Sequence, residues 1–515
     1  MKAYEDPRTM NQNAYAALRA RFPADRSRVF IRTEEGRTYS YAALEDTSAR
    51  YARLLVQLGI AKGDRVAGQV EKSAEAIFLY LACLRLGAVY MPLNTAFRET
   101  EIEYFFKDAG PKVAVASPAL QAMTKTVARR TGVGHVLTLG LSGDGSLPER
   151  AAGLEGESAL AACAADDLNS IVYTSGTTGR PKGAMLTNGL LIWNALVLSD
   201  LWRFTPDDVL LHVTPIAYGL FGTTNVALMS ACSMILLPKF EVAPVMRQLP
   251  NATVFVGVPT YYVRLMAEPS FGPEVCRNMR LFVTGSAPMR ADVFEAFRER
   301  SGHVLLDRYG LTETLLFTSN LFDAKREPDN SGLPLPGVKV RITGEDGRPV
   351  PQGDIGMIEM RAPYMFKGYW NMPDKTRETS SGDGFFITGD MGRILTNGHV
   401  SLVGRGKDMI ITGGINVYPK EIEQYLNAIE GVAESAVLGV PHPDYGEGVI
   451  AIIQPKAKAG GNLSEAGVIG ALKGSIAGFK VPKRVFFIEE IPRNALGKIQ
   501  KNLLREARME TFAIN

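Results

Sequence analysis

The feature that most constrains the fold is an alternation of strand-like and helix-like patterns over most of the first 320 residues. Residues 76–81 begin an apolar helix that should stop at Gly87, and residues 88–94 then read as a strand. Similar alternations recur at 99–118, 133–139 and 209–237. This rhythm predicts doubly wound parallel sheets covered by helices on both faces.

Beyond about Asn320 the pattern changes to short β-rich runs separated by Gly/Pro turns, which predicts a small β-barrel or antiparallel sheet. The segment 403–408, Val-Gly-Arg-Gly-Lys-Asp, has the composition of a linker, and a fresh βα pattern follows it. We therefore predict a large N-terminal domain over 1–404 and a small, mobile α+β domain over 405–515.

The composition excludes several classes of protein. The chain has 515 residues, 46% of them hydrophobic and 22% charged, with a net charge of +3, which gives no support to nucleic-acid or membrane-surface binding. The charged start, residues 1–6, has no apolar core of a signal peptide. The four cysteines are widely scattered and match no metal or disulfide spacing. A cytoplasmic protein is the expectation.

The most informative stretch is Ile171–Gly183, IVYTSGTTGRPKG. A short apolar strand turns abruptly into hydroxyl residues, glycines and one lysine. Glycines allow close approach of the backbone, while N–H groups, hydroxyls and an ammonium supply many donors and no competing negative charge. The stretch therefore predicts a phosphate-chain site, although Lys182 precedes Gly183 and so does not fit the Walker pattern.

Two later strands end in turns with similar potential. Residues 279–288 form an apolar strand followed by Gly285-Ser286-Ala287, and residues 304–306 lead into Asp307-Arg308-Tyr309-Gly310-Leu311-Thr312-Glu313. Ligands of parallel α/β sheets bind beyond the carboxyl ends of the strands. An aromatic ring, hydroxyls and a carboxylate at such a place fit nucleotide stacking and a metal-bound phosphate.

Taken together and in this order, these motifs resemble those of the adenylate-forming superfamily, which comprises acyl-CoA synthetases, luciferases and carrier-protein adenylation domains. The resemblance spans roughly residues 25–505. It implies a two-step reaction in which a carboxylic acid is adenylated by ATP with Mg²⁺ and then transferred to coenzyme A.

The resemblance also implies roles for individual residues. For the phosphates of ATP these are Thr174, Ser175, Gly176, Thr177, Thr178, Gly179 and Lys182, and for adenine and ribose Gly285, Ser286, Ala287, Asp307, Tyr309, Gly310, Thr312, Asp390 and Arg405. Glu313 and Thr177 would hold Mg²⁺, Lys498 would be the catalytic lysine and Lys407 the hinge. Gly413 and Gly414 would line the tunnel for the pantetheine arm of CoA.

Within the superfamily the chain is most similar to malonyl-CoA synthetases, as in Glu71-Lys72-Ser73 and Trp202–Asp208. A diacid needs a cation for its second carboxylate, for which Arg264 is the first candidate, with Ser286 as a donor and Arg280 as a weaker alternative. The chain departs from the family at Tyr218-Gly219, where an aromatic–His pair is usual and none of the five histidines falls in the slot, and at Leu316, where malonate enzymes tend to have methionine.

Other functions stay open at this point. The acid could be methylmalonate or a short-chain or aromatic monoacid, and the acceptor could be a carrier protein instead of CoA. A non-catalytic relative should lack the phosphate stretch, Glu313 or Lys498, and all three are present. The sequence leaves both a monomer and a homodimer open.

Overall fold

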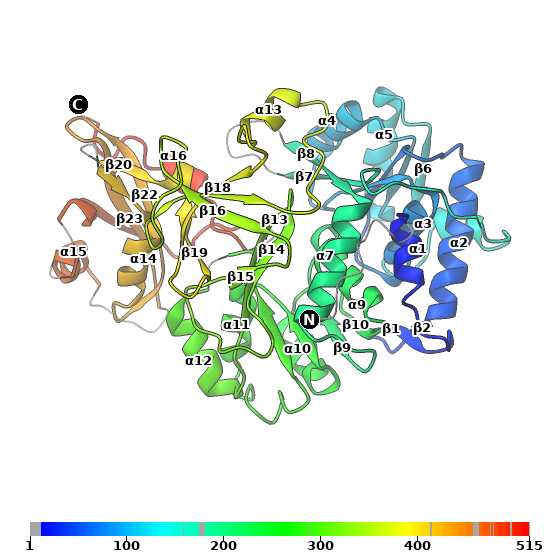
Figure 1. Ribbon diagram of the computed structural model, residues 1–515, viewed down its shortest axis with the longest axis horizontal. Helices are drawn as coiled ribbons and strands as arrows, with labels where there is room; N and C mark the ends of the chain where they lie inside the picture. Colours follow the sequence, from blue (N-terminus) through cyan, green and yellow to red (C-terminus); the bar gives the residue numbers. More distant parts are fainter. Residues whose placement is uncertain are drawn as a thin grey trace.

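A computed structural model gives the architecture of the chain (Figure 1) and describes residues 12–157, 159–174, 181–287, 289–412, 415–456, 463–473, 475–476, 478–494 and 497–513. Within these residues the strands form four sheets. The small domain with β20, β22, β23, α14 and α15 lies at one end of the long axis, at the left of Figure 1, and the six-stranded sheet lies at the other. The predicted α/β class is confirmed.

The first two sheets are largely parallel, as the alternating pattern predicted. The six-stranded sheet has the order β6 (His135–Thr138), β5 (Val113–Ala116), β3 (Arg65–Gln69), β4 (Val89–Pro92), β7 (Leu168–Thr174), β8 (Lys182–Thr187). The nine-stranded sheet has the order β15 (Leu333–Pro334), β14 (Leu315–Ser319), β13 (Leu306–Leu311), β12 (Leu281–Thr284), β11 (Val254–Val256), β9 (Val209–His212), β10 (Ser233–Leu236), β1 (Val29–Thr33), β2 (Thr38–Ser40). Neighbours from β13 to β1 in this second sheet are parallel, so their carboxyl ends share one edge.

Helices cover both sheets. Those of the large domain are α1 (Ala14–Arg19), α2 (Tyr41–Gln57), α3 (Ala74–Leu86), α4 (Glu99–Ala109), α5 (Gln121–Thr131), α6 (Ser146–Ala151), α7 (Asn188–Leu201), α8 (Ile216–Gly219), α9 (Asn225–Met229), α10 (Val242–Gln248), α11 (Pro259–Met266), α12 (Ala291–Ser301) and α13 (Pro373–Glu378). Helix α3 is buried along its whole length, and Gly87 ends it at a φ of 63°. Its apolar residues join α7 and α9 in one large core between the two sheets.

The strands expected to form a small barrel are β16 (Lys339–Thr343), β17 (Gly356–Arg361), β18 (Phe386–Ile394) and β19 (Val400–Arg405), which pair in antiparallel order. Asp390 lies on β18 and Arg405 at the end of β19. A short 3₁₀ turn, Gly406–Asp408, follows and carries Lys407. The predicted domain boundary at 404/405 therefore falls at the end of this sheet.

The small domain is built around a mixed sheet of β20 (Ile410–Thr412), β21 (Ile415–Val417), β22 (Val432–His442), β23 (Gly446–Pro455) and β24 (Arg484–Phe487). Its helices are α14 (Pro419–Asn427), α15 (Glu465–Lys473) and α16 (Lys501–Glu506). Pro419 occupies the first turn of α14, as predicted, because its missing N–H costs no hydrogen bond there.

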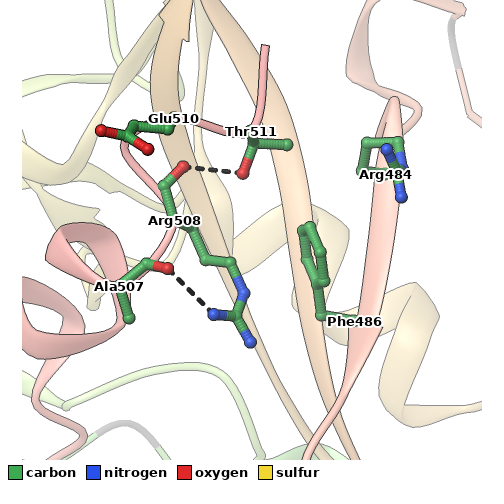
Figure 2. Close-up of a pocket in the computed structure, with 6 residues that line it drawn as sticks. All are labelled: Arg484, Phe486, Ala507, Arg508, Glu510 and Thr511. Carbon is green, nitrogen blue, oxygen red and sulfur yellow. Dashed lines mark hydrogen bonds between the residues drawn. The ribbon is translucent and has the colours of Figure 1, made fainter. Parts of the chain in front are cut away.

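The chain after α16 returns to β24. Figure 2 shows Arg508 beside the ring of Phe486 in a hollow of about 320 Å³, and the guanidinium carbon lies 4.7 Å from the ring centroid. None of the residues that line this hollow belongs to the predicted site. Over the described parts of the chain, no helix combines the length and hydrophobicity that a membrane crossing needs.

Candidate active site

The predicted site residues gather where strands of different sheets end. Thr174 closes β7, and its hydroxyl donates to the carbonyl of Lys182 at 3.3 Å, which joins the two ends of the phosphate stretch. The five predictions Ser175, Gly176, Thr177, Thr178 and Gly179 lie outside the described residues. The Lys182 ammonium lies 4.5 Å from the ring centroid of Tyr369.

Asp390 of the four-stranded sheet forms a charged pair within that sheet and a hydrogen bond to the nine-stranded sheet. Its carboxylate accepts a hydrogen bond from the Tyr309 hydroxyl at 2.5 Å and pairs with the Arg405 Nε at 2.9 Å. Burial raises the pKa of Asp390, while Arg405 and the Tyr309 hydroxyl oppose that rise. This arrangement presents a fixed carboxylate beside an aromatic ring, as ribose and adenine recognition requires.

Glu313 stands in the turn after β13 and accepts a hydrogen bond from the Tyr369 hydroxyl at 2.7 Å. The same ring lies under Lys182, so a carboxylate and an ammonium share one aromatic support. Burial and the Glu313 charge raise the pKa of Tyr369, which keeps its hydroxyl a donor.

The carboxylate oxygens of Glu313 are suitable ligands for Mg²⁺, which usually binds one or two carboxylates together with phosphate oxygens and water. Only one hydrogen bond to its carboxylate is found among the described residues, which leaves lone pairs for a cation. No cluster of three or more His, Cys, Asp or Glu side chains exists there that could hold a metal without a nucleotide. Thr177, the other predicted metal ligand, is outside the described residues.

Lys498 reaches this cluster from the small domain. Burial lowers its pKa, as do the charges of Arg405 and Arg308, whereas Asp390 and Glu313 act in the opposite sense. These electrostatic neighbours place the ammonium between the residues predicted to hold ribose and metal.

The backbone around Lys498 is held by its own loop. Its N–H donates to the Asn494 side-chain oxygen at 3.0 Å, and its carbonyl accepts from the Asn494 N–H at 2.9 Å. Gly497 adopts a φ of 74°, and a Cβ there would lie 3.1 Å from the Thr260 hydroxyl of α11. The lysine loop therefore touches the helix that carries Arg264.

Further contacts hold the small domain in this position. The Lys420 ammonium donates to the Leu402 carbonyl at 2.6 Å, and Arg290 donates to the Ala433 carbonyl at 2.9 Å. Lys407 is exposed to solvent, and partial desolvation lowers its pKa. Gly413 and Gly414 lie outside the described residues.

The loop after β12 is conformationally unusual. Ser286 has a φ of 67°, a left-handed conformation that is rare for residues other than glycine and common at ligand sites. Gly285 before it leaves room for Arg308, because a Cβ there would lie 2.7 Å from the Arg308 guanidinium and would displace it. Ala287 continues the loop.

Arg308 was not singled out by the sequence reasoning. One of its terminal nitrogens lies 3.4 Å from the Ser286 hydroxyl, and its Nε is buried with no hydrogen-bond partner among the described residues. Burial lowers the pKa of Arg308, and burial raises that of the neighbouring Asp307 to about 7. A shielded guanidinium with unused donors beside Lys498 is suited to an anion.

The other predicted nucleotide residues follow Asp307 along β13. Gly310 packs against the carbonyl of Leu315, where no Cβ would fit, and Thr312 lies in the turn before Glu313. Sequence patterns indicated this strand through its motif, but could not show that Arg308 points toward Ser286.

The two arginines predicted for the acid have different surroundings. Arg264 is exposed on α11, with its guanidinium carbon 5.0 Å from the Phe240 ring centroid. Arg280 precedes β12 and donates to both carboxylate oxygens of Asp208 at 2.7 and 2.6 Å. The prediction for Arg280 needs correction, because it stands at the opposite end of β12 from Ser286 and Asp208 already occupies its donors.

The altered segment at residues 215–219 is helix α8, followed by a π-helical turn, Leu220–Thr224. Tyr218 belongs to α8, and its side chain is outside the description. Gly219 packs against the ring of His212, since a Cβ would lie 2.5 Å from the ring carbon Cε1. A histidine thus reaches this segment from the end of β9, although the sequence has none in the expected slot. Leu316 is buried in the main core.

Comparisons with known proteins agree with this geometry. The sequence profile described as AMP-binding enzyme matches residues 16–370, and that described as AMP-binding enzyme C-terminal domain matches residues 421–498. The chain belongs to the AMP-binding enzyme family. It is an enzyme of a family of acid–thiol ligases, and its predicted membership is confirmed.

Individual relatives differ in their acid. The chain is 30% identical to a malonate–CoA ligase of Arabidopsis thaliana over 92% of this chain and 85% of that protein. It is 33% identical to an indoleacetate–CoA ligase of Aromatoleum aromaticum over 91% of this chain and 93% of that protein.

The fold is also similar to that of MatB from Rhodopseudomonas palustris. The ATP-bound structure matches with a TM-score of 0.95 at 49% identity, covering 98% of this chain and 100% of that one. The apo structure of the same protein matches with a TM-score of 0.84 at 48% identity and the same coverage. The arrangement of this chain is therefore more similar to the ATP-bound form, which agrees with Lys498 lying in the site.

Proposed function

We propose that this chain is an ATP-dependent acyl-CoA ligase that converts malonate, ATP and CoA into malonyl-CoA, AMP and diphosphate through an acyl-adenylate. The observation that carries the choice of acid is Arg308, a shielded guanidinium with unused donors between Ser286 and Lys498. A monoacid pocket would have no use for this charge, whereas the second carboxylate of a diacid would.

In the first half-reaction a malonate oxygen attacks the α-phosphorus of ATP, and the bond to the leaving diphosphate breaks. Negative charge spreads over the phosphoryl oxygens, so positioned cations and donors supply most of the catalysis. Lys498 would lie against the α-phosphate and the reacting carboxylate, and Lys182 with the Thr174–Gly179 stretch against the outer phosphates. Bound Mg²⁺ on Glu313 and Thr177 would neutralise phosphate charge.

Adenosine would be held by the ring of Tyr309 and the loop Gly285–Ala287, with Asp390 and Arg405 on the ribose. In the second half-reaction the small domain would turn about Lys407, which removes Lys498 and brings Gly413 and Gly414 to the site. The CoA thiol would then lose its proton and attack the acyl carbon, and AMP would leave.

A second acid is favoured by one observation. The segment around Tyr218-Gly219, where the sequence departs from the family pattern, leads into a π-helical turn, Leu220–Thr224, and such turns often occur at functional sites. A pocket changed there suits methylmalonate or another small acid as the alternative substrate, and loading of a carrier protein remains the alternative to CoA.

The test is diphosphate release with ATP and Mg²⁺ against malonate, methylmalonate, succinate, acetate, butyrate, benzoate and a long-chain acid, each with and without CoA. Malonate should give the highest kcat/KM, and malonyl-CoA should appear only with CoA. Preference for a monoacid would refute the diacid assignment. Adenylate formation without any thioester from free CoA would instead indicate a carrier-protein acceptor.

A further inference from the structure

A second unpaired cation lies at the acid end of the site. Lys72 follows β3 of the six-stranded sheet and is only 5% exposed. No carboxylate of the described residues lies within ion-pair distance of its ammonium. It also precedes the positive end of α3, whose N-cap is Ser73. A buried charge in this position is costly for folding and therefore calls for a functional explanation.

The Lys72 ammonium holds the turn at which the chain departs from its family. It donates to the His212 carbonyl at 3.2 Å and to the Thr214 carbonyl at 3.0 Å, and lies 3.5 Å from the His212 Nδ1. The two carbonyls can only accept and so favour the protonated lysine, whereas burial acts in the opposite sense and lowers the pKa of Lys72 well below its usual range. Helix α8 begins two residues after Thr214.

The imidazole of His212 is fixed by the same contacts. Because an ammonium only donates, the Nδ1 facing it carries a lone pair, and the proton lies on Nε2, 3.3 Å from the Thr224 hydroxyl. Burial, reinforced by the Lys72 charge, lowers the pKa of His212 to about 3, so the ring is neutral. Within this cluster a positive charge can therefore reside on Lys72, where the two carbonyl acceptors favour it, and not on His212.

The topology brings this charge to the edge that carries Ser286. Strands β9, β11 and β12 are consecutive and parallel, so the ends of β9 and β12 are two strand spacings, about 10 Å, apart. At an effective dielectric constant near 20, a unit charge at about 10 Å changes the affinity for an anion by roughly tenfold. Lys72 and Arg308 thus approach the same region from two sides.

We propose that Lys72 is a positioning residue that determines specificity: it holds the His212–Gly219 turn with a buried positive charge and so favours an acid with a second carboxylate. This rests on the proposed ligase function. Malonate turnover by the wild-type enzyme tests that function, while the change in acid preference on substitution tests Lys72, so the two can fail separately.

The experiment compares kcat/KM for malonate and for propionate in Lys72→Met and Lys72→Gln. Methionine removes charge and hydrogen bonds, whereas glutamine removes the charge but keeps donors for the two carbonyls. The ratio of malonate to propionate should fall about tenfold in both variants, mainly through the KM for malonate. Lys62→Met, at an exposed lysine paired with Asp167, is the matched control and should leave the ratio unchanged.

An equal loss on both acids would mean that Lys72 only maintains the structure, and would overturn the proposal. A wild-type ratio in Lys72→Gln with a lowered one in Lys72→Met would overturn the role of the charge. If Lys72→Met does not fold, the malonate-to-propionate ratio of kcat/KM in Lys72→Gln tests the proposal: a fall of about tenfold supports it and a wild-type ratio overturns it.

Discussion

The two ends of the site differ in how they treat charge. At the nucleotide end, Asp390 pairs with Arg405, and Glu313 and Asp390 face Lys498. At the acid end, Lys72 and Arg308 have no carboxylate within ion-pair distance among the residues that the structure describes. In the nucleotide end, acidic and basic side chains thus nearly balance before substrates bind. In the acid end, the basic side chains have no acidic partner among those residues. This difference supports the proposal of an acid with more than one negative charge.

The largest effect on activity is expected from a substitution at the nucleotide end. Lys498→Ala should reduce ATP–diphosphate exchange by about 10³-fold, because it removes the cation nearest the charge that develops on the phosphoryl group. The same variant should convert supplied malonyl-adenylate and CoA at a rate close to that of the wild type. Lys501→Ala, at a lysine of the following helix that pairs with Glu423, is the control. Equal loss in both half-reactions would refute the assignment.

The next effect tests the acid end. Arg308→Met should lower kcat/KM for malonate by about 100-fold, since a buried charged hydrogen-bond partner is lost, with little change in the KM for ATP. Arg264→Met should change either value by less than about threefold, because an exposed arginine contributes little. If kcat/KM for malonate falls only in Arg264→Met, then Arg264 and not Arg308 binds the second carboxylate. Steady-state kinetics with both variants decides between them.

A smaller effect is expected in the pH dependence of the two half-reactions. Adenylation requires the Lys498 ammonium, and burial lowers the pKa of that group below the usual 10.5. As the pH rises through this lowered pKa the ammonium is lost, so kcat/KM for ATP should fall about tenfold per pH unit above it. The alkaline limb should lie below pH 10.5, and thioester formation from supplied adenylate should lack it. A limb shared by both half-reactions would argue against Lys498 as its source.

The smallest catalytic effect is expected at Arg280. Arg280→Met should lower the midpoint of thermal unfolding by about 5 °C, because the Asp208 carboxylate, only 4% exposed, loses its bidentate partner. Activity per folded molecule should stay within twofold of the wild type. Differential scanning calorimetry with kinetics below the transition provides both values. A selective rise in the KM for malonate would contradict the structural role.

The nucleotide end could be predicted from the sequence because its residues sit in short motifs that end strands. The motif of Tyr309 and Glu313 lies far along the chain from Asp390 and from Lys498, yet each motif specifies a turn whose backbone fixes the side chain. The class of the fold followed in the same way, because the strand–helix rhythm permits few other arrangements.

The acid end depends on packing between distant segments, which no local pattern records. Arg264 and Arg308 are both arginines next to apolar segments, and only the burial of the Arg308 Nε and its approach to Ser286 separate them. His212 reaches Gly219 across a turn, and Lys72 contacts the carbonyls of His212 and Thr214 from the other sheet. Pairing of Arg280 with Asp208 likewise depends on tertiary structure.

The contact between Gly497 and Thr260 joins the small domain to α11, the helix of Arg264, which the proposed function would set beside the acid. Because α11 is shared, closure of the small domain and occupancy of the pocket are linked equilibria, and linkage is reciprocal. An acid that leaves α11 undisturbed strengthens closure, and closure strengthens its binding by the same factor. An acid too large for the pocket would push on α11 and weaken the binding of ATP, although it touches no part of the nucleotide. Selectivity would then be visible in the affinity for ATP before any bond is made.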